Sequence, residues 1–358
     1  MQLNEGHAVN PEARDTALTD IFASSPDNPC SDTSCVLIES IGRFQVREAM
    51  VLCCQDRRFA MKVRYLKTRF DLVVGVVVLG AALSAFAQAP KFTLTVHTGR
   101  GANGYDVNST MISGQKDMLL IDPQFTLSEA HKLAAEILES KKNIATIYVT
   151  HPHPDHLFGL AVLKEAFPNA KILALPATIS GAKTGWPARQ RFWVSTYGNN
   201  IPGPDPVLPD ELTVPYLTLE GEQFPVTGPV AGSDGAGNSY VFVPSLKAVI
   251  TGDIVFDHVY FGVTRDKARE DWNKTIDQIL ALQPAIVVPG HEGPGAKHDV
   301  SAINFMKKYM ADWDANVAKS RNAAEMRENV LKQYPGLGME FTLNDRINTY
   351  FPAPAAAK

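Results

Sequence analysis

The chain has 358 residues, of which 45% are hydrophobic and 20% charged, and its formal net charge is -4 at pH 7. These values are typical of a globular protein. No basic stripe or basic run follows residue 70 and the overall charge is mildly acidic, which excludes a nucleic-acid partner from our expectations.

The first ninety residues differ from the rest of the chain. Residues 1–60 are polar and irregular, and we predict an N-terminal extension there. From residue 61, a basic leader precedes an apolar run, Leu72 to Ala87, and the small-residue pattern AFAQA. This order predicts a secretory signal peptide over residues 61–89, cleaved after Ala87 or Ala89. A retained membrane anchor is the alternative, but the run is shorter than the roughly 20 residues of a spanning helix.

A signal peptide normally begins a chain, so we expect translation to start at Met61, or at Met50, with the preceding text a start-site artefact. The mature protein would then be periplasmic or secreted, without a membrane span after cleavage. All four cysteines precede the predicted signal: Cys30, Cys35, Cys53 and Cys54. The mature part would therefore hold no disulfide and no thiolate ligand, and nitrogen and oxygen atoms would bind any metal.

Residues 90–358 alternate between strand and helix patterns. We predict strands at 91–99, 109–123 (two strands joined by a turn around Gly114), 144–150, 170–176, 239–245, 247–253 and 285–291. We predict helices at 126–143, 160–167, 265–282 and over much of 300–333. This alternation indicates one layered α/β domain with helices at its C-terminal end.

The stretch from Pro176 to Pro215 is rich in proline and glycine. We predict a long connection without regular structure, which usually serves as a binding loop or lid. Its aromatic residues either pack the loop onto the domain or contact a substrate, and both interpretations stay open. They are Trp186, Phe192, Trp193 and Tyr197.

Three histidines and an aspartate lie within the six residues HPHPDH, which begin where a predicted strand ends. In layered α/β folds, ligands gather at the carboxyl ends of strands. On a turn, His151 and His153 can share one ion, while Asp155 and His156 can face an adjacent position. Imidazole and carboxylate together suit zinc, and also iron or manganese. Unrelated surface or core histidines are a poor account of this cluster, so we predict a metal site.

Two more strand ends carry metal-binding side chains, Asp253 in VITGDIVF and His291 in AIVVPGHEG. A carboxylate can bridge two cations that lie about 3.5–4 Å apart, and we predict this arrangement for Asp253. Asp122 in LLIDP also ends a strand. It either orients a ligand or is an ordinary turn residue.

The motif HPHPDH, followed by TGD and PGH, resembles the metallo-β-lactamase fold superfamily, whose signature is H-x-H-x-D-H. The resemblance covers about Phe92 to Gly295 and includes the hairpin text VNSTMISGQKDMLLIDP. It implies a four-layer αβ/βα sandwich and a metal-dependent hydrolase with two divalent metal ions, zinc being favoured over manganese or iron(II). By position, His151 and His153 would hold the first metal, Asp155, His156 and His291 the second, and Asp253 would bridge them.

One ligand that the resemblance implies is missing. The family supplies another histidine to the first metal just before the strand that reads SYVFVP here, but no histidine lies between residues 157 and 257. Counting back from Pro244, as in family members that read H-T-x-D-N before this strand, puts Asp234 in the position of that histidine. A looser alignment puts Gly232 there, with Asp234 nearby. We predict that Asp234 replaces the imidazole, which would favour harder cations such as manganese or iron. The alternatives are a plain turn for SDGAG and a role for His258, if its loop folds back.

The resemblance implies metal-assisted hydrolysis of an ester, lactone, amide or related bond in a small molecule. Asp155 would orient the nucleophile or carry its proton. The alternatives are an iron-dependent, sulfur-oxidising enzyme of the same fold and a non-catalytic protein that binds a metal or ligand. Tyr260 and Phe261, shortly after Asp253, indicate an apolar or aromatic substrate.

Overall fold

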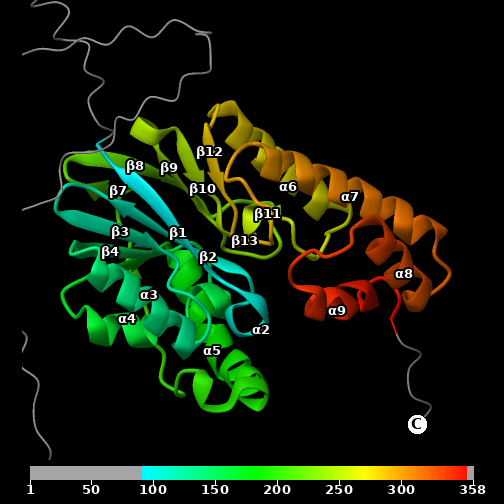
Figure 1. Cartoon of the computed structure of the whole chain (residues 1–358), viewed down its shortest axis with the longest axis horizontal. Coiled ribbons are helices and arrows are strands. Elements are labelled where there is room, and N and C mark those ends of the chain that lie inside the picture. Colours follow the sequence, from blue (N-terminus) through cyan, green and yellow to red (C-terminus); the bar gives the residue numbers. More distant parts are fainter. Residues whose placement is uncertain (1–90, 353–358) are drawn as a thin grey trace, which may run out of the picture. The chain divides into compact units, whose positions relative to one another are not determined.

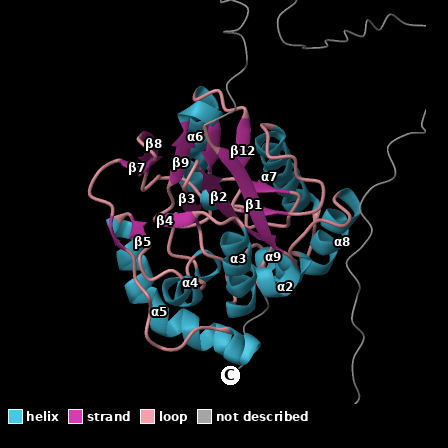
Figure 2. Cartoon of the chain, turned by 60° about the vertical axis from the view of Figure 1, so that its left-hand side comes forward, coloured by secondary structure: helices cyan, strands magenta, loops and turns pink. Residues whose placement is uncertain are grey.

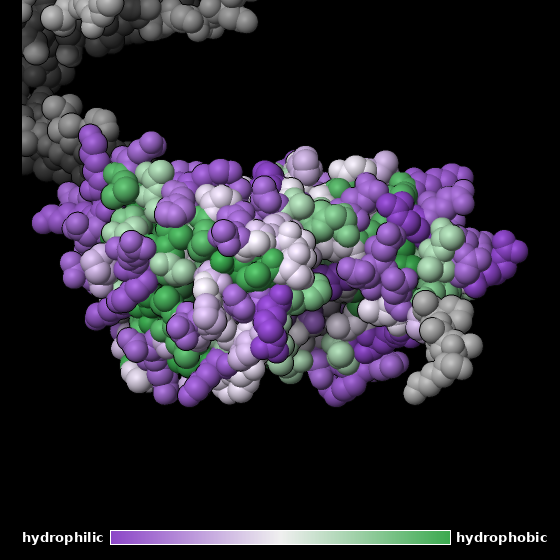
Figure 3. Space-filling view, turned by 90° about the horizontal axis from the view of Figure 1, so that it is seen from below, coloured by the Kyte–Doolittle hydropathy of each residue, from purple (hydrophilic) through white to green (hydrophobic). Residues whose placement is uncertain are grey.

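The computed structural model describes residues 91–352, which form two packed β-sheets with helices on their outer faces (Figure 1, Figure 2). The predicted N-terminal extension and signal peptide lie outside these residues. Within residues 91–352, no helix is long and apolar enough to cross a membrane. The face drawn in Figure 3 mixes hydrophilic residues with smaller hydrophobic groups.

The first sheet has eight strands. They are β1 (Thr93–Gly99), β2 (Val107–Ser113), β3 (Asp117–Ile121), β4 (Asn143–Val149), β5 (Lys171–Ala174), β6 (Asp210–Glu211), β11 (Phe256–Asp257) and β13 (His291–Glu292). Their order is β11-β13-β2-β3-β4-β5-β6, and β1 also pairs with β2. Strands β3, β4 and β5 are parallel, so their carboxyl ends share one edge of the sheet.

The second sheet has five strands. They are β7 (Tyr216–Leu219), β8 (Glu222–Thr227), β9 (Tyr240–Val243), β10 (Ala248–Ile250) and β12 (Ile286–Val288). Their order is β12-β10-β9-β8-β7, and β10 and β12 are the parallel pair. The carboxyl ends of these two strands therefore lie side by side. The sequence patterns did not predict β6, β7 and β8.

Helices cover the outer face of each sheet (Figure 1). The helices of the described residues are α2 (Gly101–Gly104), α3 (Leu127–Glu139), α4 (Leu160–Ala166), α5 (Pro176–Tyr197), α6 (Asp266–Ala281), α7 (Ser301–Lys319), α8 (Ala323–Gln333) and α9 (Leu343–Asn348). The first sheet packs on α3, α4 and α5, and the second sheet packs on α6 and α7.

Three hydrophobic clusters fill the spaces between these layers, because successive side chains of a strand point to opposite faces. On β4, Ile147 packs against the helices α3 to α5, whereas Tyr148 faces the second sheet. On β10, Ala248 and Ile250 face the first sheet, whereas Val249 packs with α6 and α7. This alternation produces the four-layer αβ/βα sandwich, and the predicted fold class is confirmed.

The prediction of a structureless stretch from Pro176 to Pro215 is wrong, because α5 occupies its first 22 residues. Pro176 is tolerated in the first turn, where a helix needs no donor from that residue. Ala182 and Trp186 are buried against the first sheet. This tertiary packing overrides the low helix propensity of the glycines and of Pro187.

The single long helix predicted over residues 300–333 is instead two helices. Helix α7 ends at Lys319, and Asn322 begins α8 as its N-cap, because its side chain accepts a hydrogen bond from Glu325 N at 2.9 Å. At the start of α3, Thr126 is the N-cap, and its Oγ1 accepts a hydrogen bond from Glu129 N.

Glu220 connects the two sheets, because it joins the turn between β7 and β8 to the turn between β2 and β3. Glu220 lies in the tight turn between β7 and β8, with a positive φ of 45°. Its carboxylate accepts hydrogen bonds from the backbone N–H groups of Gln115, Lys116 and Asp117 at 2.6–3.0 Å, in the turn between β2 and β3. These three donors lower the pKa of Glu220 to about 2.

The Glu220→Gln variant should therefore unfold more easily than the wild type at neutral pH. The carboxylate is stabilising above its ordinary pKa of 4.5, and this contribution disappears as the pH falls toward 2. Urea denaturation at several pH values should show a difference between the two proteins at pH 7 that closes between pH 4.5 and 2. A difference that stays constant over this range would contradict the assignment. Glu211→Gln, on the exposed strand β6, is the matched control.

Candidate metal centre

The candidate centre lies where strands of both sheets end. Asp122 follows β3, and His151 follows β4, whose carboxyl end is adjacent because the two strands are parallel. Asp253 follows β10 in the short 3-10 helix η5 (Gly252–Ile254), and His291 follows β12. His291 itself pairs with Phe256 of β11 and Val107 of β2, which brings it into the first sheet. The layered fold thus brings together side chains that are far apart in the sequence.

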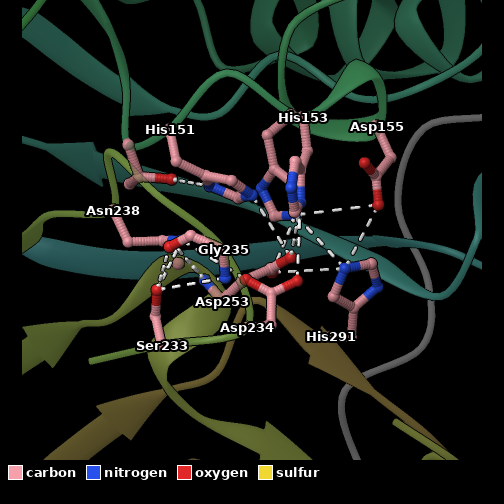
Figure 4. A network of polar contacts seen from close by, with 12 residues as sticks. His151, His153, Asp155, Ser233, Asp234, Gly235, Asn238, Asp253 and His291 are labelled. Atoms are coloured by element: carbon pink, nitrogen blue, oxygen red, sulfur yellow. Dashed lines mark hydrogen bonds and ion pairs between the residues drawn. The ribbon is translucent and has the colours of Figure 1, made fainter. Parts of the chain in front are cut away.

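The structure gathers the predicted side chains into two groups that meet at Asp253 (Figure 4), and a third group, of Asp122, His151 and His156, shares one histidine with each of them. In the first group, ligand atoms lie within 4.8 Å of one another; its members are His151, His153, Asp234 and Asp253. The second group meets the same limit and contains Asp155, His156 and His291. All seven predicted site residues therefore belong to one constellation.

Asp253 divides its two carboxylate oxygens between these groups. Its Oδ2 lies 3.2 Å from His151 Nε2 and 3.4 Å from His153 Nδ1. Its Oδ1 lies 3.1 Å from His156 Nε2 and 3.2 Å from His291 Nε2. A carboxylate that bridges two cations presents its oxygens in this way.

Three of the four histidines are oriented by a hydrogen-bonding partner at the other ring nitrogen. His156 Nδ1 lies 2.8 Å from Asp122 Oδ2, and His291 Nδ1 lies 2.8 Å from the carbonyl oxygen of Tyr105. Both partners are acceptors, so each Nδ1 donates a hydrogen bond and each Nε2 is the atom that can bind a proton or a cation. His151 Nδ1 is 3.0 Å from the Thr150 hydroxyl.

Asp122 is an orienting residue, which resolves the alternative left by its sequence. In addition to His156, its carboxylate accepts hydrogen bonds from the backbone N–H and the hydroxyl of Thr150, both at 2.8 Å. Thr150 immediately precedes the histidine cluster. Asp122 therefore fixes both the first turn of the cluster and the direction of one imidazole.

The protonation of the histidines reflects a strongly negative centre. Burial lowers the pKa of His151 to about 4, so its ring is neutral at pH 7. Burial also lowers the pKa of His291, but the carboxylates of Asp253 and Asp155 outweigh this effect and raise it to about 10. The same opposition between burial and Asp253 raises the pKa of His156 well above its ordinary value. The acidic groups therefore attract positive charge, which a proton or a bound cation can supply.

The residues fit a cation in their chemistry as well as in their spacing. His151 Nε2 and Asp253 Oδ1 are buried and form no hydrogen bond within residues 91–352. His156 Nε2 and His291 Nε2 face each other at 3.2 Å, and the outer hydrogen bonds of both rings leave these two atoms to bind a proton or a cation. Buried acceptors that converge without a donor are costly unless a cation lies among them.

Asp234 belongs to the first group, for which the resemblance implied a further histidine. Its Oδ2 lies 3.5 Å from His153 Nδ1, and burial together with the charge of Asp253 raises its pKa to about 7. The loop around it is tied down by Asn238, whose amide nitrogen donates to Asp234 Oδ1 at 3.3 Å and to Ser233 Oγ at 3.0 Å. Asp234 is thus a member of the group rather than an isolated turn residue.

Asn238 is a positioning residue that sequence analysis missed. It is fully buried, and its side-chain oxygen accepts a hydrogen bond from the backbone N–H of Asp253 at 3.2 Å. It therefore connects the loop of Asp234 to the turn of Asp253. The only local signal was its place in SDGAGN, directly before a strand, where asparagine is common for turn geometry alone.

The centre opens into a cavity of about 400 Å³. Besides the candidate ligands, aromatic side chains from three parts of the chain line this cavity: Tyr105, Phe192, Trp193 and Phe256. Trp186 is buried in the core, whereas Phe192 is exposed and lines the cavity, so the aromatic residues of α5 lie in two different environments.

The structure places three residues near Asp253 away from the candidate centre. Tyr260 and Phe261 are fully buried and pack in the cluster between the second sheet and its helices, so they line no part of the cavity. His258 lies outside both metal-binding groups. Its ring stacks on Phe305 and its Nδ1 lies 2.6 Å from Asp257 Oδ1, which gives it a structural role.

An αβ/βα sandwich with a buried cage of histidines and aspartates at its strand ends defines a class of metal-binding proteins. The family model of the metallo-beta-lactamase superfamily matches residues 102–291, which is more than half of the chain. The chain belongs to the metallo-beta-lactamase superfamily.

Individual relatives are more distant. A protein of Streptococcus pyogenes serotype M6, named a probable metallo-hydrolase, is 29% identical over 161 residues. This match covers 42% of the chain and 62% of the relative, so the chain spans less than two thirds of the relative's length. A metallo-beta-lactamase family protein from Thermus thermophilus has a similar fold, with a TM-score of 0.50 and 18% identity over 73% of this chain and 94% of that one. A metallo-beta-lactamase from Pontibacter korlensis has a TM-score of 0.45 at 18% identity, over 62% of this chain and 99% of that one.

Proposed function

We propose that the protein is a metal-dependent hydrolase that holds two divalent cations, with zinc as the favoured metal. The observation that carries this proposal is Asp253, whose two oxygens face two separate groups of ligand atoms at 3.1–3.4 Å. The family and the name of the streptococcal relative support the same reaction class.

His151, His153 and Asp234 would hold one cation, and Asp155, His156 and His291 the other, with Asp253 between them. Bound divalent cations supply Lewis acidity, which makes water nucleophilic near neutral pH and polarises the bond to be broken. The chain supplies a dry, rigid setting for this chemistry, because His151, His156, Asp253 and His291 are all at most 2% exposed.

Asp155 would orient the attacking water and accept its proton. Its Oδ2 lies 3.2 Å from His291 Nε2, and its side chain borders the cavity. Burial raises the pKa of Asp155, but the hydrogen bond and charge of His291 and the charge of His156 lower it well below its ordinary value. The group is therefore a carboxylate at neutral pH, as a proton acceptor must be.

The substrate we propose is a small molecule with an ester, lactone, amide or related bond and an apolar or aromatic group. The aromatic lining of the cavity supports the second part: the rings of Tyr105 and Trp193 pack edge to face, with centroids 5.4 Å apart, beside the exposed Phe192. A flat, apolar group would bury its surface against these rings.

The decisive experiment measures metal content and hydrolysis together. Protein purified without chelator should contain two equivalents of metal and hydrolyse members of a panel of aryl esters, lactones and β-lactams. Dipicolinate should abolish turnover, and added zinc or manganese should restore it. Oxygen consumption with a sulfur substrate, in place of hydrolysis, would support an iron oxidoreductase instead. Ligand binding without any turnover would support a non-catalytic protein.

Asp234→Ala should lower the metal content from two equivalents to about one, because it removes an anionic ligand from one group only. Asp234→His should retain two equivalents, because imidazole is a good ligand for the same cations. Elemental analysis of the dialysed proteins checks both results, with exposed Asp205→Ala as the control. Two full equivalents in Asp234→Ala would remove this residue from the ligand set.

We further propose that the protein is exported to the periplasm or secreted. The basic leader, apolar run and AFAQA pattern of residues 61–89 support this proposal. N-terminal sequencing of protein recovered from the extracytoplasmic fraction should begin at Gln88 or Pro90. An intact leader on cytoplasmic protein would overturn it.

A further inference from the structure

The cavity contains one positively charged side chain that the proposed chemistry does not use. Arg346 is the only lysine or arginine among its lining residues. It belongs to α9, which follows the segment matched by the superfamily and ends the described part of the chain. Family membership therefore carries no information about this residue.

Arg346 has no charged partner within residues 91–352. No carboxylate lies within 4.0 Å of its guanidinium, and its Nε is buried without a hydrogen-bond partner. By contrast, Arg269 pairs with Asp314 and Arg327 pairs with Glu340. A buried, unpaired donor is costly, and a ligand with acceptor oxygens would remove this cost.

The position of Arg346 is fixed by the packing of its helix. Leu343 and Ile347, on either side of it, are at most 1% exposed and belong to the cluster between the second sheet and its helices. The side chain runs so close to Gly262 that a Cβ there would lie 3.3 Å from Arg346 Cδ and Nη1. The guanidinium is therefore held at the cavity, which lowers the entropic cost of binding a ligand.

An aromatic wall lies in the same cavity. Phe192 and Trp193 of α5 pack with ring centroids 4.8 Å apart, and Tyr105 contacts both Trp193 and the exposed Phe341, which lies next to α9. The cavity thus combines an apolar wall, a cationic side chain and the candidate metal centre.

We propose that Arg346 determines specificity by binding an anionic group of the substrate, while the aromatic wall holds its apolar body. The substrate class is then an apolar or aromatic molecule that carries a carboxylate, sulfonate, sulfate or phosphate group besides the bond that is hydrolysed. This inference rests on the proposed function for the reaction, but the binding itself requires no turnover. A guanidinium recognises such oxyanions through paired N–H donors.

The test is a fluorescence titration of the metal-loaded full chain. Of the four tryptophans, Trp193 is partly exposed in the cavity, whereas Trp186, Trp272 and Trp313 are buried. The probes are naphthalene-2-sulfonate and its neutral counterpart, methyl 2-naphthyl sulfone, because sulfonates are weak metal ligands. Trp193→Phe controls for the source of the signal.

The wild type should bind the sulfonate more tightly than the sulfone. Arg346→Met should weaken sulfonate binding about 10- to 100-fold and leave sulfone binding unchanged, as expected for the loss of a charged hydrogen bond. Arg346→Lys should retain part of the preference, and Arg191→Met, an exposed arginine of α5 outside the cavity lining, should retain all of it.

The proposal would be overturned if the wild type bound both probes equally, or if Arg346→Met bound the sulfonate as tightly as the wild type does. The absence of a fluorescence response to either probe would also overturn it. If Arg346→Met does not fold, the comparison of the two probes on the wild type and on Arg346→Lys still decides. Metal-dependent hydrolysis without a sulfonate preference would reject this inference alone. A sulfonate preference in a protein that hydrolyses nothing would reject the proposed function alone.

Discussion

Asp253→Asn should lose both metal equivalents and nearly all hydrolytic activity. The substitution removes the one carboxylate that faces both groups of ligands, and an amide oxygen carries no charge to hold two cations together. We expect turnover to fall by at least about 10³-fold, since metal charge stabilises the transition state by several kcal/mol. Elemental analysis and initial rates, measured on the same preparation, check this result.

The control for Asp253→Asn is the same change at Asp257, a buried aspartate four residues further along that belongs to neither group. Asp257→Asn should keep its metal and its activity if it remains folded by circular dichroism. Retention of two metal equivalents in folded Asp253→Asn would show that the aspartate does not bridge.

Trp272→Ala should have the largest effect on stability. Its side chain is completely buried between the second sheet and α7, and its Nε1 donates to the carbonyl oxygen of Ile254 at 2.8 Å. The substitution would leave a large cavity and an unpaired acceptor, and we expect the free energy of unfolding to fall by about 3–5 kcal/mol. Urea denaturation with an unchanged slope would measure this loss.

The same tryptophan supports the candidate site. Ile254 directly follows Asp253, and the start of the Asp234 loop packs so closely on α6 that a Cβ on Gly232 would lie 2.0 Å from Trp272 N. Trp272→Ala should therefore also weaken metal retention. The exposed Phe192 is the comparison for stability: Phe192→Ala should change the free energy of unfolding by less than about 0.5 kcal/mol. A loss of that size for Trp272→Ala would contradict the packing argument.

Much of the metal centre could be predicted because its chemistry is local in the sequence. His151, Asp253 and His291 each follow a short, apolar strand, and parallel strands bring such positions to one edge. The alternation of strand and helix then sufficed for the layered fold. Asp234 was harder, since SDGAG is also a common turn, and only its distance from His153 distinguishes the two interpretations.

Other features depend on contacts that no local pattern contains. Helix α5 forms in spite of its glycines and Pro187 because it buries Ala182 and Trp186 against the first sheet. Phe261 follows Asp253 closely in the sequence, yet the loop after β11 directs it into the core. Arg346 lies far beyond the histidine cluster, in a short helix whose position follows from the packing of the C-terminal segments.

The residues that line the cavity come from two separate parts of the chain, which can diverge independently in evolution. The cage is built by residues 122–291, whereas Met339, Thr342, Asp345 and Arg346, which line the same cavity, come from the C-terminal segment. Mutational drift in this tail would change which molecules are accepted while the candidate metal ligands remain in place. Relatives that share the cage but differ after residue 291 are then expected to perform one chemistry on different compounds.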